Sequence, residues 1–367
     1  MLDHLLSTCI VHFRKITRVN EEPQLVNRFS CPGNGYFLGK EFHVITDMSV
    51  NQCAVSINLF TLWVMWVYLL CLGTARIKYG IMVDAGSSGT RAHLYTWESG
   101  TEIPNVLPVR INGDAQFVKM SIRLAKAAKD PDVIATICTK IIEYAKDRIP
   151  NAEIQNTRIF IYCTAGMRLL PPPDQQRILN STFEYLQKHS PFKVKSRYIR
   201  VLTGVEEGVF GWLSVNHLLG NLISGHTTGA LDMGGASFQI AVESPEEGPD
   251  VYPLNVGSKR FLVFAHSYLG YGANEALRKV NLAISSIMGS DNITNPCYPI
   301  GFVQKVHKIN VNGSGDRERC ESLVDALLVE SAEFKSVDVP KHSSYPHFVG
   351  MSSFFYLNSF LNLPPGS

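Results

Sequence analysis

Two stretches of this sequence place an aspartate at the end of an apolar strand and follow it with a loop of small residues. The first, YGIMVDAGSSGTRAHLYTW, runs from Tyr79 to Trp97 and carries Asp84. Its loop consists of Gly86, Ser87, Ser88, Gly89 and Thr90. Small residues let backbone N–H groups approach an anion closely, and hydroxyls add further donors. A carboxylate beside such a loop can hold a metal ion through water next to bound phosphates, although a plain turn has the same composition.

The second stretch repeats this pattern in ALDMGGASFQIAV, from Ala230 to Val242. Asp232 ends its first strand, and the small residues Gly234, Gly235, Ala236 and Ser237 follow. The two aspartates lie far enough apart in the sequence for each to belong to its own lobe. Two such hairpins facing each other would clamp a polyphosphate from both sides. We therefore predict the two-lobed, ribonuclease H-like α/β fold that actin, sugar kinases and Hsp70 share.

Between the hairpins, Glu206 and Glu207 stand at the start of a predicted helix from Gly204 to Asn221. Carboxylates are favoured there by the helix dipole, so capping alone would explain the pair. A phosphoanhydride hydrolase also needs a carboxylate that takes a proton from the attacking water. The position of the pair between two candidate phosphate loops makes it a candidate for that role.

Other segments have the periodicity of the elements that would support these loops. Arg158 to Cys163 is a short apolar strand that leads into Thr164-Ala-Gly-Met-Arg168, which is either a ligand loop or a strand-to-helix turn. Pro131 to Ile149 and Pro171 to His189 show the spacing of amphipathic helices. The apolar stretch from Phe348 to Leu363 is predicted to be helical.

An uncharged apolar run, AVSINLFTLWVMWVYLLCLGTA, extends from Ala54 to Ala75. About 20 apolar residues suffice to cross a bilayer as a helix, so we predict a single transmembrane signal anchor here. A buried core helix and a cleaved signal peptide are the alternatives. The expected organisation is a cytosolic segment over residues 1–53, the anchor over 54–75, a first lobe over 76–202 and a second lobe over 203–367.

Features after this run predict a lumenal or extracellular location for the lobes. Sequons for N-glycosylation occur at Asn180, Asn292 and Asn312, and none precedes the run. Cys297 and Cys320 flank a polar, glycine-containing segment and form a candidate disulfide in an oxidising compartment. Cys138 and Cys163 are predicted to be buried free thiols. The net charge of +2 gives no electrostatic reason to propose a nucleic-acid partner.

Five segments together resemble the signature regions of nucleoside triphosphate diphosphohydrolases, the apyrase-type enzymes. They are DAGSSGTRAHLY at 84–95, YCTAGMRLLP at 162–171, TGVEEGVFGWLSVNHLLG at 203–220, ALDMGGASFQIAV at 230–242 and FVGMSSFFYLNSFLNL at 348–363. The resemblance covers residues 79–363. It implies a nucleotide bound in the cleft between the lobes, and hydrolysis of nucleoside tri- and diphosphates with Ca²⁺ or Mg²⁺. An oligomer is compatible with it.

The same resemblance implies roles for individual residues. Asp84 and Asp232 would hold the metal ion through waters, and Glu207 matches the catalytic base. Ser237 and Gln239 would help to position the attacking water, and Thr164 lines the same centre. The residues implied to cradle phosphate are Ser87, Ser88, Gly89, Thr90, Gly234, Gly235, Ala236 and Ser237.

Departures from the family pattern bear on substrate and activity. Gly89 stands where cell-surface members carry histidine, as in organelle-resident members that prefer UDP or GDP, so we expect a Golgi or endomembrane diphosphatase. Phe238 replaces a small hydroxyl residue beside the second loop. Family members continue beyond the position of Ser367, so we expect an incomplete form. The alternatives are a kinase or chaperone-type ATPase of the same fold class, and an inactive relative that acts as a binding partner.

Overall fold

A computed structural model describes residues 76–306, 308–340 and 347–362 of the protein, and those from Ile77 onward belong to one compact unit. The cytosolic segment and the membrane anchor predicted over residues 1–75 lie outside this part of the chain. Within it, no helix combines the length and the apolar character needed to cross a bilayer.

The first lobe is built on a six-stranded sheet with the order β3-β2-β1-β7-β8, to which β6 adds by pairing with β2. Its strands are β1 (Ile77–Ala85), β2 (Thr90–Glu98), β3 (Leu107–Pro108), β6 (Phe117–Met120), β7 (Arg158–Cys163) and β8 (Ile199–Val201). β1 and β2 form an antiparallel hairpin, and β7 runs parallel to β1. Short strands β4 (Arg110–Ile111) and β5 (Asp114–Ala115) pair beside it.

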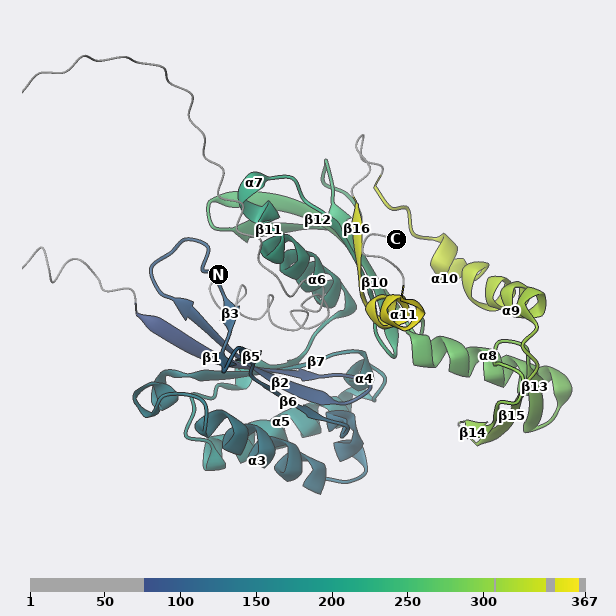
Figure 1. Ribbon diagram of the computed structural model, residues 1–367, viewed down its shortest axis with the longest axis horizontal. Helices are drawn as coiled ribbons and strands as arrows, with labels where there is room; N and C mark the ends of the chain where they lie inside the picture. The colour runs from purple at the N-terminus through teal and green to yellow at the C-terminus, as the bar shows by residue number, and fades with distance from the viewer. Residues whose placement is uncertain (1–75, 307, 341–346, 363–367) are drawn as a thin grey trace, which may run out of the picture. The chain divides into compact units, whose positions relative to one another are not determined.

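Helices cover both faces of this sheet, which is why the buried middle of β1, Gly80–Val83, and most of β7, Ile159–Cys163, are apolar. α3 (Asp132–Lys146) and α5 (Pro172–His189) lie on one face (Figure 1) and bury Ile137 and Ile178 against it. α6 (Gly204–Leu218) lies on the other face, and its Trp212 shares a core with Met82 of β1. Strands buried on both faces lose the alternation of polar and apolar residues.

The second lobe is a five-stranded sheet with the order β11-β12-β10-β9-β16. Its strands are β9 (Gly229–Met233), β10 (Ser237–Glu243), β11 (Val251–Val256), β12 (Lys259–Leu269) and β16 (Phe348–Ser352). α6 packs between this sheet and the first one, and every residue from Glu207 to Asn216 is buried. A helix enclosed on all sides is expected to carry apolar residues all round, as this one does from Val209 to Leu213.

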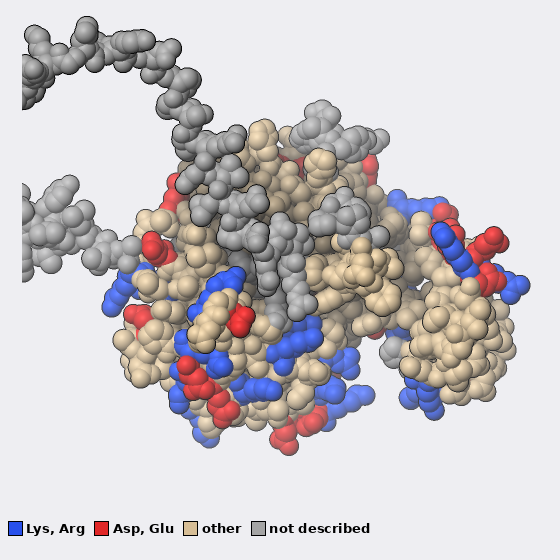
Figure 2. Space-filling view, viewed as in Figure 1, with Lys and Arg blue, Asp and Glu red and all other residues tan. Residues whose placement is uncertain are grey.

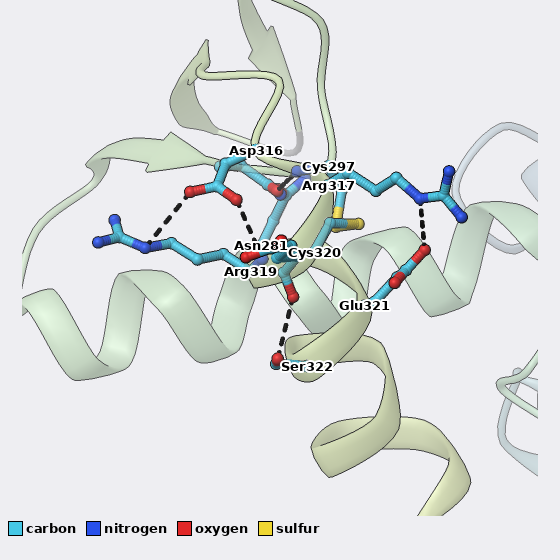
Figure 3. Close-up of a disulfide and its surroundings, with 10 residues drawn as sticks. Asn281, Cys297, Asp316, Arg317, Arg319, Cys320, Glu321 and Ser322 are labelled. Atoms are coloured by element: carbon cyan, nitrogen blue, oxygen red, sulfur yellow. Dashed lines mark hydrogen bonds and ion pairs between the residues drawn. A yellow bond between two sulfur atoms is a disulfide. The ribbon is translucent and has the colours of Figure 1, made fainter.

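A smaller part of the second lobe extends from α8 (Ala273–Met288). Strands β13 (Asn292–Asn295), β14 (Val303–Val306) and β15 (Ile309–Gly313) and helix α9 (Arg317–Val324) surround a small core. The predicted disulfide between Cys297 and Cys320 is present and joins the loop after β13 to α9 (Figure 3). The sequon residues Asn180, Asn292 and Asn312 are all exposed.

The C-terminal stretch differs from its prediction. Residues Phe348 to Ser352 form β16, parallel to β9, and only the following Ser353–Leu361 form a helix, α11. The edge of the second sheet offers backbone partners to Phe348–Ser352, and this pairing overrides the local helical pattern. α11 leaves Leu357 and Phe360 exposed, in a region where Figure 2 shows uncharged residues.

Candidate active site

The two hairpins contribute to one cavity of about 260 Å³ between the lobes. The first hairpin brings Asp84 from the end of β1, and the second brings the loop between β9 and β10. The predicted site residues that line the cavity are Asp84, Ser87, Ser88, Thr164, Glu207, Gly234, Gly235, Ala236 and Ser237. Segments that are distant in the sequence therefore meet at one place, with two small-residue loops, buried hydroxyls and two buried carboxylates around it.

The remaining predicted residues do not line the cavity. Asp232 and Gln239 are buried behind its wall, and Gln239 Nε2 donates a hydrogen bond to Ser237 Oγ at 2.7 Å. Thr90 is fully buried, and its hydroxyl donates to the carbonyl of Ile122 at 2.8 Å. Thr90 therefore fixes the first hairpin rather than facing a ligand.

Gly89 has a steric reason to be glycine in this protein. Its φ is +156°, and a Cβ atom at this position would lie 2.5 Å from the carbonyl oxygen of Met120. Any side chain would push against β6 backbone, which a rotamer change cannot relieve. A histidine at this position, as in the cell-surface pattern, would therefore require the loop to move.

The unusual Phe238 points away from the cavity. Strand residues alternate between faces, so the neighbours Ser237 and Gln239 turn to the site while Phe238 turns to the other side. There it stacks on Tyr268, with ring centres 5.8 Å apart, and meets Phe354 edge-on. The replacement thus serves packing between β10, β12 and α11.

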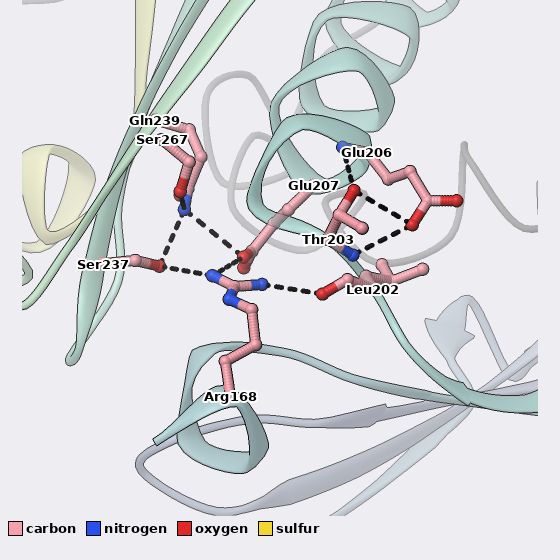
Figure 4. Close-up of polar contacts among 8 residues, drawn as sticks. All are labelled: Arg168, Leu202, Thr203, Glu206, Glu207, Ser237, Gln239 and Ser267. Carbon is pink, nitrogen blue, oxygen red and sulfur yellow. Dashed lines mark hydrogen bonds and ion pairs between the residues drawn. The ribbon is translucent and has the colours of Figure 1, made fainter. Parts of the chain in front are cut away.

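The two glutamates at the start of α6 have separate environments (Figure 4). Glu206 forms a capping box with Thr203, and Arg200 donates to its carboxylate at 2.6 Å. Partial burial opposes ionisation of Glu206, but the hydrogen bonds from Thr203 and Arg200 outweigh it and lower its pKa. Glu206 is therefore committed to the helix end.

Glu207 points instead into the cavity and is 8% exposed. Its Oε2 accepts hydrogen bonds from Arg168 Nη2 at 2.8 Å and from Gln239 Nε2 at 3.3 Å. Gln239 in turn donates to Ser237 and Ser267, so the carboxylate belongs to a buried polar network. A carboxylate held in this way has a fixed direction, as a general base needs.

Each hairpin aspartate has a different partner. Arg91 Nη1, on β2 of the same hairpin, lies 3.3 Å from Asp84 Oδ2. Asp232 Oδ1 accepts a hydrogen bond from the hydroxyl of Ser352, at the end of β16. Ser352 has φ +60° and ψ −112°, a conformation that non-glycine residues adopt only under constraint.

The oxygen donors present fit a divalent ion that is shared with a nucleotide. Hard cations such as Ca²⁺ and Mg²⁺ prefer carboxylates, hydroxyls and waters, and Mg²⁺ is often bound by one or two carboxylates plus substrate phosphates. Asp84 and Asp232 supply one carboxylate from each hairpin. No group of three or more His, Cys, Asp or Glu in the described part of the chain could hold a metal ion without such a ligand.

Several cavity residues escaped the sequence reasoning. They are Arg91, His93, Lys119, Ser352, Ser353 and Tyr356, together with Arg168 behind the wall. Arg91 and Arg168 lie inside motifs that were interpreted through their small residues alone. Ser352 had no local signal, because its role depends on the pairing of β16 with β9.

Comparisons with known proteins find relatives over most of the chain. The model of the GDA1/CD39 (nucleoside phosphatase) family matches residues 72–364. The nucleoside-triphosphatase ntp-1 of Caenorhabditis elegans is 32% identical over 70% of this chain and 50% of its own. The Golgi apyrase of Schizosaccharomyces pombe is 32% identical over 76% of this chain and 55% of its own. The chain thus spans about half the length of these relatives.

A solved structure shows a similar fold. The crystal structure of nucleoside triphosphate hydrolases from Neospora caninum superimposes with a TM-score of 0.56 at 13% sequence identity. The match covers 86% of this chain and 80% of that one. The predicted two-lobed α/β fold is therefore confirmed.

Proposed function

The chain belongs to the GDA1/CD39 (nucleoside phosphatase) family, and we propose that it hydrolyses the terminal phosphoanhydride bond of nucleoside di- and triphosphates. The observation that carries this proposal is the meeting of Asp84, Glu207 and Ser237 around one cavity that both hairpin loops line. The reaction uses water and releases orthophosphate and the shortened nucleotide.

In this proposal Glu207 takes the proton from the attacking water. The water oxygen forms a bond to the terminal phosphorus while the bond from phosphorus to the bridging oxygen breaks. Ser237 and Thr164, whose hydroxyls lie at the same cavity, orient the water, and Gln239 holds Ser237. Backbone N–H groups of the two loops stabilise the charge on the phosphoryl oxygens. The loop residues that would donate these N–H groups are Ser87, Ser88, Gly234, Gly235 and Ala236.

Asp84 and Asp232 would hold Ca²⁺ or Mg²⁺. When bound, the ion neutralises charge that develops on the phosphates. The two carboxylates supply the negative potential that attracts it. Phosphate release that continues undiminished in excess EDTA would exclude this part of the proposal.

The test of the base compares neighbouring glutamates. Glu207→Gln keeps size and hydrogen bonding but removes the basic oxygen, so turnover should fall about 10²–10⁴-fold with KM nearly unchanged. Glu206→Gln is the matched control, because that side chain caps α6 and pairs with Arg200. Equal losses in the two variants, or near-normal turnover in Glu207→Gln, would contradict the assignment.

We propose UDP and GDP as preferred substrates. Support comes from Gly89, which stands where the cell-surface pattern has histidine, and from relatives named Golgi apyrase and nucleoside-diphosphatase mig-23. Phosphate release from UDP, GDP, ADP and ATP should be measured under matched Ca²⁺ and Mg²⁺. A wild-type protein that hydrolyses ATP fastest would refute the preference. Gly89→His is a poor test, since its Cβ meets the Met120 carbonyl.

We further propose that the enzyme is a single-pass glycoprotein of the Golgi or endomembrane lumen, anchored by residues 54–75. The exposed sequons and the disulfide between Cys297 and Cys320 suit an oxidising lumen. Carbonate extraction, endoglycosidase treatment and co-staining with a Golgi marker test the three parts of this proposal. Staining of unpermeabilised cells would indicate a location at the cell surface and contradict the Golgi or endomembrane location.

A further inference from the structure

Arg168 makes hydrogen bonds to groups from three different segments (Figure 4). Its Nη1 donates to the carbonyl of Leu202 at 3.0 Å. Its Nη2 donates to Glu207 Oε2 at 2.8 Å and to Ser237 Oγ at 3.2 Å. Arg168 ends the short helix α4 (Ala165–Arg168), which follows β7 of the first sheet.

The three partners lie at points that matter for the reaction. Leu202 precedes Thr203, the residue that caps α6, so this contact fixes the start of the helix that carries Glu207. Ser237 begins β10 directly after the second phosphate loop. A single guanidinium from the first lobe therefore spans the helix start, the candidate base and the end of the second loop.

Little water reaches this contact. The side chains of Arg168 and Glu207 are 13% and 10% exposed. Charge-assisted hydrogen bonds are strong in such surroundings, and removal of one partner leaves the other charge buried and unpaired. The planar fork of arginine also fixes directions that the single ammonium of lysine cannot reproduce.

We propose that Arg168 is a positioning residue for Glu207, holding the carboxylate aimed at the water-binding side of the cavity. The proposal rests on the proposed function, in which Glu207 is the base. Arg168 acts through Glu207 and Ser237 and need not touch the nucleotide. It also makes the direction of the base depend on the contact between α4 and β10, one from each lobe.

The first test is the substitution series Arg168→Ala and Arg168→Lys in the full chain. Arg168→Ala should lower kcat about 10²–10³-fold and change KM less than about threefold, because substrate binding keeps both loops. Arg168→Lys keeps the charge and should recover part of that loss. Arg177→Ala is the matched control, since Arg177 pairs with Asp174 at an exposed site on α5 and should keep wild-type kcat.

A double-mutant cycle separates positioning from general support of the fold. If Arg168 acts through Glu207, then Arg168→Ala in a Glu207→Gln background should lower kcat less than about 10-fold further. Added guanidinium should restore part of the rate to Arg168→Ala and none to Glu207→Gln. Additive losses in the cycle, or no rescue in a folded Arg168→Ala variant, would overturn the proposal.

The two proposals can fail separately. A wild-type protein without phosphohydrolase activity would refute the proposed function, and a fully active Glu207→Gln variant would refute the assignment of the base. If Glu207→Gln lowers kcat as expected and Arg168→Ala lowers it further by its full amount in the same background, only the role of Arg168 would be refuted. If Arg168→Ala does not fold, as judged by circular dichroism, Arg168→Lys decides: wild-type kcat in that folded variant would overturn the proposal.

Discussion

The hairpin of β1 and β2 pairs its aspartate with a cation, whereas the hairpin of β9 and β10 pairs its aspartate with a hydroxyl. Arg91 belongs to the same hairpin as Asp84 and lies 3.3 Å from it. Ser352, the partner of Asp232, follows 120 residues later in the chain. The partner of Asp84 therefore lies within its own hairpin, whereas Asp232 receives its hydrogen bond from β16, a strand that comes much later in the chain.

The ion pair with Arg91 gives the first hairpin an electrostatic feature of its own. Arg91 offsets part of the charge of Asp84, so in the proposed function a divalent ion would compete with Arg91 for this carboxylate. Two hairpins with the same sequence pattern could then contribute unequally to binding of the same metal ion.

The largest expected effects come from removing each charge. Asp84→Asn and Asp232→Asn should each lower kcat about 10²–10³-fold, because each removes a carboxylate that is proposed to hold the metal ion. The metal concentration for half-maximal activity should rise less in Asp84→Asn, because Arg91 already offsets part of the charge of Asp84. Titration with Mg²⁺ and with Ca²⁺ at saturating nucleotide measures this.

The control for these variants is Asp250→Asn, which removes an aspartate that pairs with His266 at the surface of the second lobe. It should leave kcat and the metal requirement unchanged. Equal shifts of the metal requirement in Asp84→Asn and Asp232→Asn would remove the proposed inequality between the hairpins.

The next effect compares one glycine from each loop. Gly89→Ala should destabilise the fold by about 2–4 kcal/mol, because its Cβ would lie 2.5 Å from the Met120 carbonyl and its φ is strained for other residues. Gly234→Ala should cost under about 1 kcal/mol, since its Cβ finds only ordinary contact with Ser237 at 3.6 Å. Urea unfolding of both variants measures the difference. Similar losses of unfolding free energy in the two variants would show that the first loop accommodates a Cβ atom as easily as the second.

The sequence was sufficient to predict the fold and the two hairpins, because their patterns are local. A strand that ends in aspartate and is followed by small residues can be recognised within one short stretch. For Glu206 and Glu207, the resemblance to a known family selected Glu207, whereas the local pattern as first interpreted did not separate the two. The pattern Thr203-x-x-Glu206 is a capping box that commits Glu206 to the helix end, and this local signal could have separated the two glutamates.

Contacts between distant segments could not be predicted from local patterns. Arg168 meets Glu207 and Ser237 only because α4, α6 and β10 converge in the folded chain. Ser352 meets Asp232 because β16 pairs with β9, in a stretch whose local pattern predicted a helix. Such residues require the register of the sheets, which periodicity does not provide.

A smaller effect concerns the partner of Asp232. Ser352→Ala removes the hydrogen bond to a buried carboxylate but keeps the strained backbone, so it should cost about 2 kcal/mol. Ser352→Gly also loses the bond but relieves the positive φ, and should cost about 1 kcal/mol less than Ser352→Ala. Ser353→Ala, one residue later, is the control. If the alanine variant is the more stable of the two, the positive φ at Ser352 does not lower the stability of the protein.

The smallest effect lies beneath the first hairpin and appears only in alkali. Burial, and secondarily the charge of Asp84, raises the pKa of the Cys163 thiol from 9.0 to about 12. Cys138 reaches about 12 through burial alone. A thiol with a raised folded-state pKa contributes its full stability below the unfolded pKa, near 9, and loses it as the pH rises from about 9 to 12.

At pH 10 the free energy of unfolding is therefore lower by about 1.4 kcal/mol for each of these thiols than at neutral pH, because the thiolate forms in the unfolded chain. Cys163→Ala should flatten the fall of the unfolding free energy between pH 8 and 10.5, measured by urea unfolding, and Cys138→Ala should flatten it to a similar degree. Asp84→Asn should reduce the part due to Cys163 slightly, whereas Asp232→Asn should not, because only Asp84 acts on that thiol. Asp232→Asn could instead change the pH dependence of the unfolding free energy as much as Asp84→Asn does. The charges of the two hairpins would then be coupled across the cavity, and the prediction that only Asp84 affects Cys163 would be wrong.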